Sequence, residues 1–318
     1  MTIGYNKCTM SCFFLRRLIL IIAVLILVGV YYTRPDDKYN GFQYVIKVED
    51  FIPPFINILS DLFVAPEYGL AACGIRKSMT QLTVNIMCLL YDPISFRANN
   101  QSLNDTWILE KPCQSRNRTF QTRPDKLKNY ANMTKIAFIR DPFDRFISFY
   151  LDKCVNETVC WNCGDDMYCI VRRLYKSLKQ LKIHRNKKPT YTELHAAPIS
   201  WYCDFNKDLK NYILLKKGVK KEERKNSVMQ LTKILTAKNV PTDLINAIVE
   251  GSLNGETLHS THSSSRRIRA EHLVRTDPVI RDYLHKIYFY DYIIFDFDRQ
   301  VLDIEYRTTS GEKWIINV

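Results

Sequence analysis

Arg140 and Ser148 are the two residues best suited to bind an anion. Arg140 ends an apolar segment, and Ser148 follows eight residues later in an amphipathic pattern. If the segment is a strand, Arg140 lies at the carboxyl edge of a sheet, where open α/β sheets bind ligands. A guanidinium and a hydroxyl on one helical face could then hold the same phosphate. The alternative is a structural salt bridge, either Arg140 with Asp144 or Asp141 with Arg145, and the spacing leaves both readings open.

A second candidate anion site lies in the polar loop that follows the apolar segment 70–75. A loop that ends a strand and opens a helix presents backbone N–H groups to an anion. Lys77 adds a positive charge there, and Ser78 and Thr80 add hydroxyl donors. The loop contains no glycine, which is unusual for a nucleotide-binding loop. A basic surface loop is therefore the alternative.

Strands and helices must flank these two loops to position them. Asp141 is a suitable N-cap, and Pro142 a suitable first residue, for the helix that would carry Ser148. The apolar patterns predict strands over 70–75, 135–140 and 292–297 and helices over 82–90, 143–151 and 273–289. Alternation of strands and helices indicates an α/β fold, with a central, mainly parallel sheet flanked by helices.

The segment 140–150 (RDPFDRFISFY) resembles the 3′-phosphate-binding motif of the Golgi carbohydrate sulfotransferases. The likeness is greatest to the branch of the chondroitin 4-O and HNK-1 sulfotransferases, especially its nematode-type members. Segment 72–78 (ACGIRKS) resembles the 5′-phosphosulfate-binding loop of that family. Segments 259–262 and 288–295 resemble its C-terminal portion. Met79 stands where the cytosolic sulfotransferases carry a glycine.

The resemblance implies a P-loop-like sulfotransferase fold and a sulfuryl donor, 3′-phosphoadenosine 5′-phosphosulfate, with no metal. Lys77 would stabilise the bridging oxygen, and Arg140 and Ser148 would hold the 3′-phosphate. His259, Thr261, Ser264 and Arg266 would form a polar lid over the donor, with a solvated serine-rich turn as the alternative. The implied donor-binding residues are Arg76, Lys77, Ser78, Met79, Thr80, Arg140, Ser148, Thr261, Ser264 and Arg266.

The acceptor hydroxyl needs a general base, and His195 is the first candidate among six histidines. It precedes an aromatic segment that contains Cys203 and would suit a sugar. A hydrogen-bonded structural histidine is the alternative, and an Asp or Glu could serve as the base instead. The predicted catalytic residues are Lys77 and His195.

The net charge of +13 favours polyanionic partners such as sulfated or uronate glycans. The composition is otherwise that of an ordinary globular protein, which excludes a wholly disordered or collagen-like chain. Basic residues concentrate in 172–188, where a solvated helix face is the alternative to a glycan-binding patch. Chondroitin or a related glycosaminoglycan is favoured by the resemblance alone. The predicted acceptor-binding residues are Arg172, Arg173, Lys176 and Lys179.

The N-terminal sequence predicts a single-pass type II protein of the Golgi membrane. Residues 18–32 are uninterruptedly apolar and are preceded only by basic charges, so they predict a signal anchor with a lumenal C-terminal part. A cleaved signal peptide is the alternative, but the bulky residues that follow do not suit a signal peptidase. The predicted parts are a cytosolic tail (1–17), the anchor (18–32), a stem (33–62) and one lumenal domain (63–318). This location disfavours nucleic acid as a partner.

Cysteines and sequons agree with an oxidising lumen. Eight cysteines follow the anchor, and an even number favours disulfides, although the sequence does not give their pairing. Zinc held by the four cysteines of 154–169 is the alternative. The candidate glycosylation sites are Asn100, Asn104, Asn117, Asn132 and Asn156.

Two other functions compete with sulfuryl transfer. Asp296 and Asp298 form a D-x-D pair, of the kind that binds manganese and a sugar diphosphate in type II glycosyltransferases. A lumenal glycan-binding protein without catalysis would explain the basic segment, but not two anion loops at strand ends. Manganese dependence would indicate the first function, and glycan binding without donor binding would indicate the second.

Overall fold

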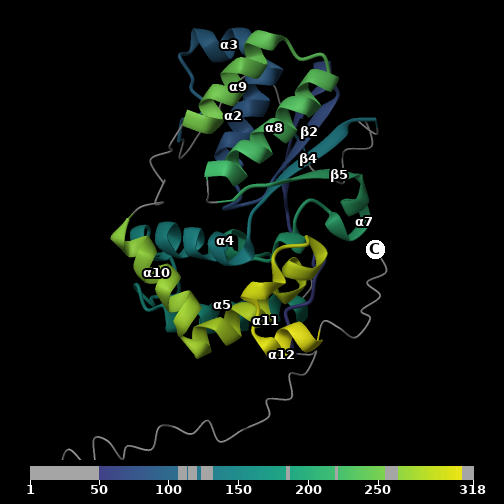
Figure 1. Ribbon diagram of the computed structural model, residues 1–318. Coiled ribbons are helices and arrows are strands. Elements are labelled where there is room, and N and C mark those ends of the chain that lie inside the picture. Colours follow the sequence, from purple (N-terminus) through teal and green to yellow (C-terminus); the bar gives the residue numbers. More distant parts are fainter. Residues whose placement is uncertain are drawn as a thin grey trace, which may run out of the picture. The chain divides into compact units, whose positions relative to one another are not determined.

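The computed structural model describes residues 50–106, 113, 120–122, 132–183, 187–218, 221–254 and 264–309 (Figure 1). The predicted tail, the signal anchor and most of the stem lie outside these residues. Within the described ranges, no helix is both long and apolar enough to cross a membrane.

A five-stranded sheet in the order β3-β1-β2-β4-β5 forms the centre of the described unit. Its strands are β1 (Asp61–Ala65), β2 (Leu70–Gly74), β3 (Gln121–Thr122), β4 (Thr134–Ile139) and β5 (Tyr212–Lys216). Strands β2, β4 and β5 run parallel, but β1 is antiparallel to β2 and to β3. The sheet is therefore mixed rather than mainly parallel. The connection from β1 to β2, which ends at Gly69 with φ 58°, is too short for a crossover and imposes the antiparallel pairing.

One group of helices covers one face of this sheet (Figure 1). It comprises α2 (Thr80–Tyr91), α3 (Pro93–Ala98), α8 (Lys221–Ala237) and α9 (Thr242–Asn254). Phe63, Phe138 and Leu215 project from the sheet into the core that these helices enclose. The packing of α2 on β1 and β2, and of α8 on β5, fixes the loops at the ends of those strands.

The remaining helices form a second group (Figure 1). They are α4 (Pro142–Phe149), which runs on into a π-helix (Tyr150–Asn156), α5 (Met167–Ile183), α6 (Tyr191–Ala196), α7 (Phe205–Asp208), α10 (Ser265–Thr276), α11 (Pro278–Ile294) and α12 (Ile304–Thr309). Phe51 is buried and stacks on Phe289 of α11, with ring centroids 4.4 Å apart. The packed unit thus extends N-terminally beyond the boundary predicted at residue 63.

Several predicted elements are confirmed. The segments 70–75 and 135–140 form β2 and β4, and the pattern 82–90 lies in α2. Asp141 caps α4 by accepting hydrogen bonds from the backbone N–H groups of Phe143 (2.9 Å) and Asp144 (3.0 Å).

The predictions near the C-terminus are wrong in two respects. The single helix predicted over 273–289 is two helices, because Asp277 and Pro278 end α10 and begin α11. Asp277 accepts hydrogen bonds from the N–H groups of Val279 and Ile280, both at 2.9 Å. Segment 292–297 is not a strand, since α11 continues through Ile294 and buries Tyr288 and Tyr292 one turn apart.

All eight cysteines that follow the predicted anchor form disulfides. The pairs are Cys73–Cys203, Cys88–Cys113, Cys154–Cys160 and Cys163–Cys169. The two local pairs account for the four cysteines that could otherwise have held zinc. The Cys73–Cys203 bond joins the end of β2 to the segment that follows α6.

Candidate donor-binding and transfer site

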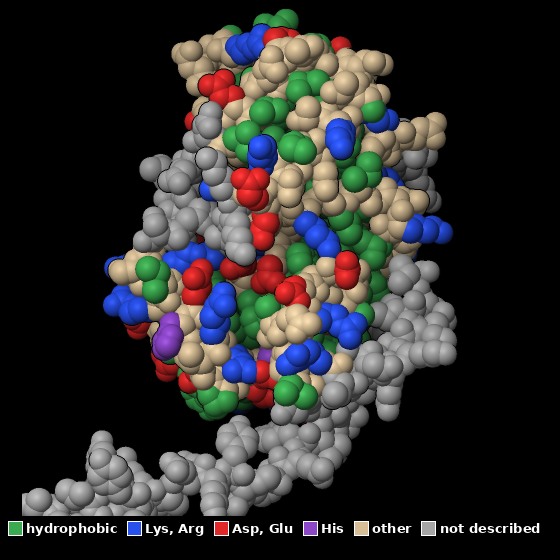
Figure 2. All heavy atoms as spheres, viewed as in Figure 1, with side chains coloured by type: hydrophobic (Ala, Val, Ile, Leu, Met, Phe, Trp, Pro, Cys, Tyr) green, Lys and Arg blue, Asp and Glu red, His purple; other side chains and the backbone are tan. Residues whose placement is uncertain are grey.

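Basic residues follow each of the three parallel strands at the carboxyl edge of the sheet. Arg76 and Lys77 follow β2, Arg140 follows β4, and Lys217 follows β5. Because the three strands are parallel neighbours, these residues gather at one edge. Figure 2 shows a hollowed face between the two groups of helices, with both basic and acidic side chains on its walls.

The loop between β2 and α2 is a tight turn with two left-handed residues, Lys77 (φ 63°) and Met79 (φ 65°). The N–H of Ser78 and the hydroxyl of Thr80 both donate to the carbonyl oxygen of Ile75, at 3.0 and 2.7 Å. Gly74 is required before this turn, since a Cβ there would lie 2.9 Å from the Phe63 ring and 3.0 Å from Thr80.

The Ser78 hydroxyl is buried in this loop, and its oxygen has no hydrogen-bond partner among the described residues. Buried polar groups are nearly always paired, so this hydroxyl indicates a ligand or a solvent partner. The side chain of Arg76 is partly exposed beside it and has no ion pair within the same ranges. The loop therefore offers hydrogen-bond donors that have no partner among the described residues.

Lys77 is held by a carboxylate from the π-helix. Its Nζ lies 2.7 Å from Oδ2 of Asp152, and Nζ of Lys153 lies 3.0 Å from the same oxygen. Burial lowers the pKa of Lys77, and Asp152 opposes that shift. Burial would raise the pKa of Asp152, but the two lysines outweigh it and bring the pKa to about 2. The carboxylate is therefore ionised and positions Lys77.

Neither of the two salt bridges considered as alternatives, Arg140 with Asp144 or Asp141 with Arg145, forms among the described residues. Asp141 caps α4, and Asp144 binds Arg267 at 3.0 Å. No ion pair or hydrogen bond to the Arg140 side chain exists among the described residues. Burial lowers its pKa to about 10, with the charges of Asp144 and Arg267 acting in opposite directions. Ser148 is partly buried, and the described part of the chain offers its hydroxyl no partner either.

Arg145 is a positioning residue that the sequence analysis did not identify. Its buried guanidinium donates hydrogen bonds to the backbone carbonyls of Arg76 (3.1 Å), Ala196 (3.4 Å) and Ala197. It also lies over the ring of Tyr288, 5.7 Å from the centroid. Arg145 thus ties the loop after β2 to the C-terminal end of α6. Its place in the segment 140–150 was the available signal.

His195 lies on α6, which begins with a capping box formed by Thr190 and Glu193. Its Nδ1 is 2.7 Å from the carbonyl oxygen of Tyr191, so Nδ1 carries the proton and Nε2 is an acceptor. Burial first, and then the charges of Arg76, Lys153 and Lys77, lower the pKa of His195 to about 3. The imidazole is therefore neutral, and it lies near enough to the loop after β2 to feel its charges.

The predicted lid residues differ in their exposure and contacts. His259 and Thr261 lie outside the described residues. Ser264 caps α10 by accepting a hydrogen bond from the N–H of Arg267 at 3.2 Å. Arg266 is exposed, whereas its neighbour Arg267 is buried against Asp144. A lid over the donor therefore stays a prediction.

The predicted acceptor patch lies on α5. Arg172, Arg173 and Lys176 are exposed. Lys179 is partly buried, 3.7 Å from a carboxylate oxygen of Asp50 and over the ring of Tyr175. These four residues share a helix with an apolar face that packs on α11, which agrees with either a glycan patch or a solvated helix face.

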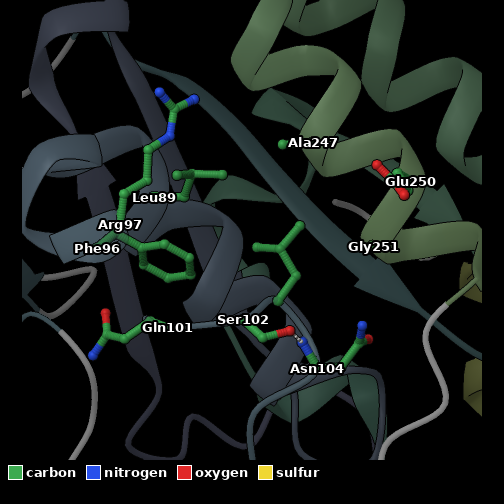
Figure 3. A pocket seen from close by; sticks show the side chains of 10 residues that line it. Leu89, Phe96, Arg97, Gln101, Ser102, Asn104, Ala247, Glu250 and Gly251 are labelled. Atoms are coloured by element: carbon green, nitrogen blue, oxygen red, sulfur yellow. Dashed lines mark hydrogen bonds between the residues drawn. The ribbon is translucent and has the colours of Figure 1, made fainter. Parts of the chain in front are cut away.

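Three of the predicted sequons, at Asn100, Asn132 and Asn156, are exposed, and Asn117 lies outside the described residues. Asn104 is partly buried and lines a pocket of about 380 Å³ between α3 and α9 (Figure 3). None of the residues predicted to bind donor or acceptor lines this pocket. It is separate from the site at the sheet edge.

The two aspartates of the D-x-D pair make different local contacts. Asp296 is almost fully exposed and lies 3.6 Å from Nζ of Lys216. Asp298 accepts a hydrogen bond from the N–H of Gln300 at 2.8 Å and begins a short 3-10 helix. Nothing in this geometry brings the two carboxylates together with a third ligand among the described residues.

Comparison with known proteins identifies the family. The sequence model of the sulfotransferase family matches residues 60–298. The chain belongs to the sulfotransferase family. This sulfotransferase is 35% identical to the carbohydrate sulfotransferase chst-1 of Caenorhabditis elegans over 261 residues, which cover 79% of each chain. It is also 28% identical to the uncharacterized protein C18B2.2 of the same organism over 271 residues, 82% of this chain and 75% of that one. The predicted resemblance to sulfotransferases, and with it the prediction of an enzyme, is confirmed.

No solved structure matches this sulfotransferase. The P-loop-like detail of the fold therefore stays a prediction, while the α/β architecture is described by the structure itself.

Proposed function

We propose that this sulfotransferase transfers the sulfuryl group of 3′-phosphoadenosine 5′-phosphosulfate to a hydroxyl of a glycan. The observation that carries the proposal is Arg140, which has no side-chain partner among the described residues and lies beside the Lys77 loop at the carboxyl edge of the parallel strands. The name of the relative chst-1 supports a carbohydrate acceptor. A glycosaminoglycan such as chondroitin, and the Golgi lumen as the location, are the finer parts of the proposal.

The hydrogen-bonding groups of the site that lack a partner among the described residues suit the phosphate and sulfate groups of this sulfuryl donor. Arg140 precedes α4 and Ser148 lies within it, and the two side chains would hold one phosphate. Arg76, the Ser78 hydroxyl and the backbone of the loop after β2 would hold the phosphosulfate at the other end. The donor supplies an activated sulfuryl group, and these residues bind and orient it.

In the transfer step, a bond forms between the acceptor oxygen and sulfur, and the bond from sulfur to the phosphate oxygen breaks. Nε2 of His195 accepts the proton of the acceptor hydroxyl. Lys77 stabilises the charge that develops on the departing phosphate oxygen. The products are a sulfate ester and 3′-phosphoadenosine 5′-phosphate.

Binding of 3′-phosphoadenosine 5′-phosphate to the full-length chain in detergent tests the donor site. Calorimetry in EDTA should show micromolar binding by the wild type and a loss of about tenfold or more in Arg140→Ala. Arg97→Ala is the matched control, because Arg97 is exposed and pairs with Asp243 away from the sheet edge. A folded wild type that fails to bind would overturn the proposal, and sugar nucleotides with manganese would be tested next.

Transfer of labelled sulfate to a panel of unsulfated glycans tests the acceptor class. Chondroitin should be sulfated faster than heparosan or a neutral polysaccharide. Labelling of a tyrosine-containing peptide, with no labelling of any glycan, would reject a carbohydrate acceptor. Co-localisation of the full chain with a Golgi marker in cells tests the location.

A further inference from the structure

Lys217 is a buried lysine with no role in the site described so far. It directly follows β5, and its exposed fraction is 8%. Among the described residues, no carboxylate and no hydrogen-bond acceptor pairs with its ammonium group. A buried ammonium without a counter-ion is unfavourable unless an anion binds to it or it loses its proton.

The backbone places Lys217 beside Arg140. The N–H of Lys217 donates to the carbonyl oxygen of Ile139 at 2.9 Å, which extends the parallel pairing of β4 and β5 by one step. Side chains alternate along a strand, so Lys217 lies on the side of Leu215, and Arg140 on the side of Phe138. Leu215 and Phe138 are paired neighbours in one core cluster, so the two cations share a face.

The preceding lysine lies on the other face. Nζ of Lys216 is 3.6 Å from a carboxylate oxygen of Asp296 and lies over the ring of Phe297. Lys216 is exposed, whereas Lys217 is buried. The two consecutive lysines therefore differ in burial, in the face on which they lie and in the presence of a carboxylate partner among the described residues.

Electrostatics support a shared anion pocket. Burial, followed by the positive charges of Arg224 and Arg140, lowers the pKa of Lys217 to about 8. Arg224 comes from α8, so cations from two strand ends and one helix act on one another. Like charges gathered with little compensation destabilise the free protein, and a bound dianion would relieve that repulsion.

We propose that Lys217 completes, with Arg140, the binding pocket for the 3′-phosphate of the sulfuryl donor. This assignment rests on the proposed function and deepens it, because it explains how the enzyme would select a donor with a second phosphate. Lys217 binds the phosphate as a point charge, while Arg140 binds it through a fork of N–H donors. The edge strand β5 thus takes part in donor recognition.

A pair of ligands that differ in one phosphate tests the assignment. The full-length wild type should bind 3′-phosphoadenosine 5′-phosphate more tightly than adenosine 5′-phosphate. Lys217→Met should weaken the first ligand about tenfold or more, and should change affinity for the second by less than about twofold. Lys216→Met is the matched control and should bind both ligands as the wild type does.

The outcomes separate this assignment from the proposed function. If the wild type binds neither ligand, the proposed function fails, and the assignment fails with it. If the wild type prefers the bisphosphate and Lys217→Met keeps that preference unchanged, only the assignment of Lys217 is overturned. Equal weakening of both ligands also overturns it, since Lys217 would then support the whole site.

Thermal unfolding of the ligand-free proteins distinguishes phosphate binding from a structural role. Lys217→Met should melt at or above the temperature of the wild type, because it removes a charge that no described residue compensates. Lys217→Arg should retain the preference for the bisphosphate. A Lys217→Met variant that melts well below the wild type, or does not fold, would show a structural role and overturn the assignment.

Discussion

His195 shows how its surroundings set the protonation state of one residue. Its carbonyl partner fixes the proton on Nδ1, and burial and nearby cations keep the ring neutral. A neutral imidazole is ready to accept a proton, and an anionic donor bound beside it would raise its pKa and make it a better base. The charge of the substrate would thereby help to create the base that the reaction needs.

The first prediction concerns His195→Asn, whose amide can still donate to the Tyr191 carbonyl but has no equivalent of Nε2. We expect kcat to fall by roughly 10²–10⁴, with binding of 3′-phosphoadenosine 5′-phosphate unchanged. Steady-state rates at saturating donor, beside calorimetry, provide the measurement. A variant with nearly full kcat would assign the base to another group.

The same residue sets the expected pH dependence. Neutral His195 is the active form, so kcat/KM should fall only as the pH drops through the pKa of His195. Since that pKa is lowered, the acid limb should lie below the ordinary histidine value of about 6.5. An acid limb at or above that value would contradict the assignment.

At the scale of elements, Arg145 joins the loop after β2 to the C-terminal end of α6. Arg145→Met should leave the carbonyls of Arg76 and Ala197 unpaired, and we expect it to reduce the free energy of unfolding by at least about 2 kcal/mol. Denaturant unfolding measures this, with exposed Arg97→Met expected to stay within about 0.5 kcal/mol of the wild type. Equal stability of the two variants would refute the positioning role.

Elements with strong local signals were predictable from the sequence. β2 and the last four residues of β4 are apolar, and α4 carries its own cap and first proline. The 292–297 segment was misassigned because aromatic and β-branched residues favour strands, whereas packing of α11 decides its structure. That the predicted anion-binding residues act together as one site stays a prediction. The partners of Asp144 and Arg145, and the position of Lys217 beside Arg140, could not be predicted, because they depend on elements distant in the sequence.

For the whole molecule, the Cys73–Cys203 bond links segments 130 residues apart and joins the end of β2 to the segment that follows α6. Replacing both cysteines with serine should reduce the free energy of unfolding by about 3–5 kcal/mol. The Cys163–Cys169 pair spans 6 residues, so its serine variant should lose less, about 2 kcal/mol. Unfolding curves compare the two variants, and the reverse order would contradict the argument from loop length.

The pairing of Lys77 with Asp152 has a consequence for selectivity among anions. A free inorganic sulfate or phosphate ion must compete with a carboxylate already in contact with the lysine, and it has no second anchor to compensate. A bisphosphate held at the β4 and β5 ends arrives at Lys77 as part of one molecule, at a high effective concentration. We therefore expect free inorganic sulfate and phosphate to be poor competitors at Lys77.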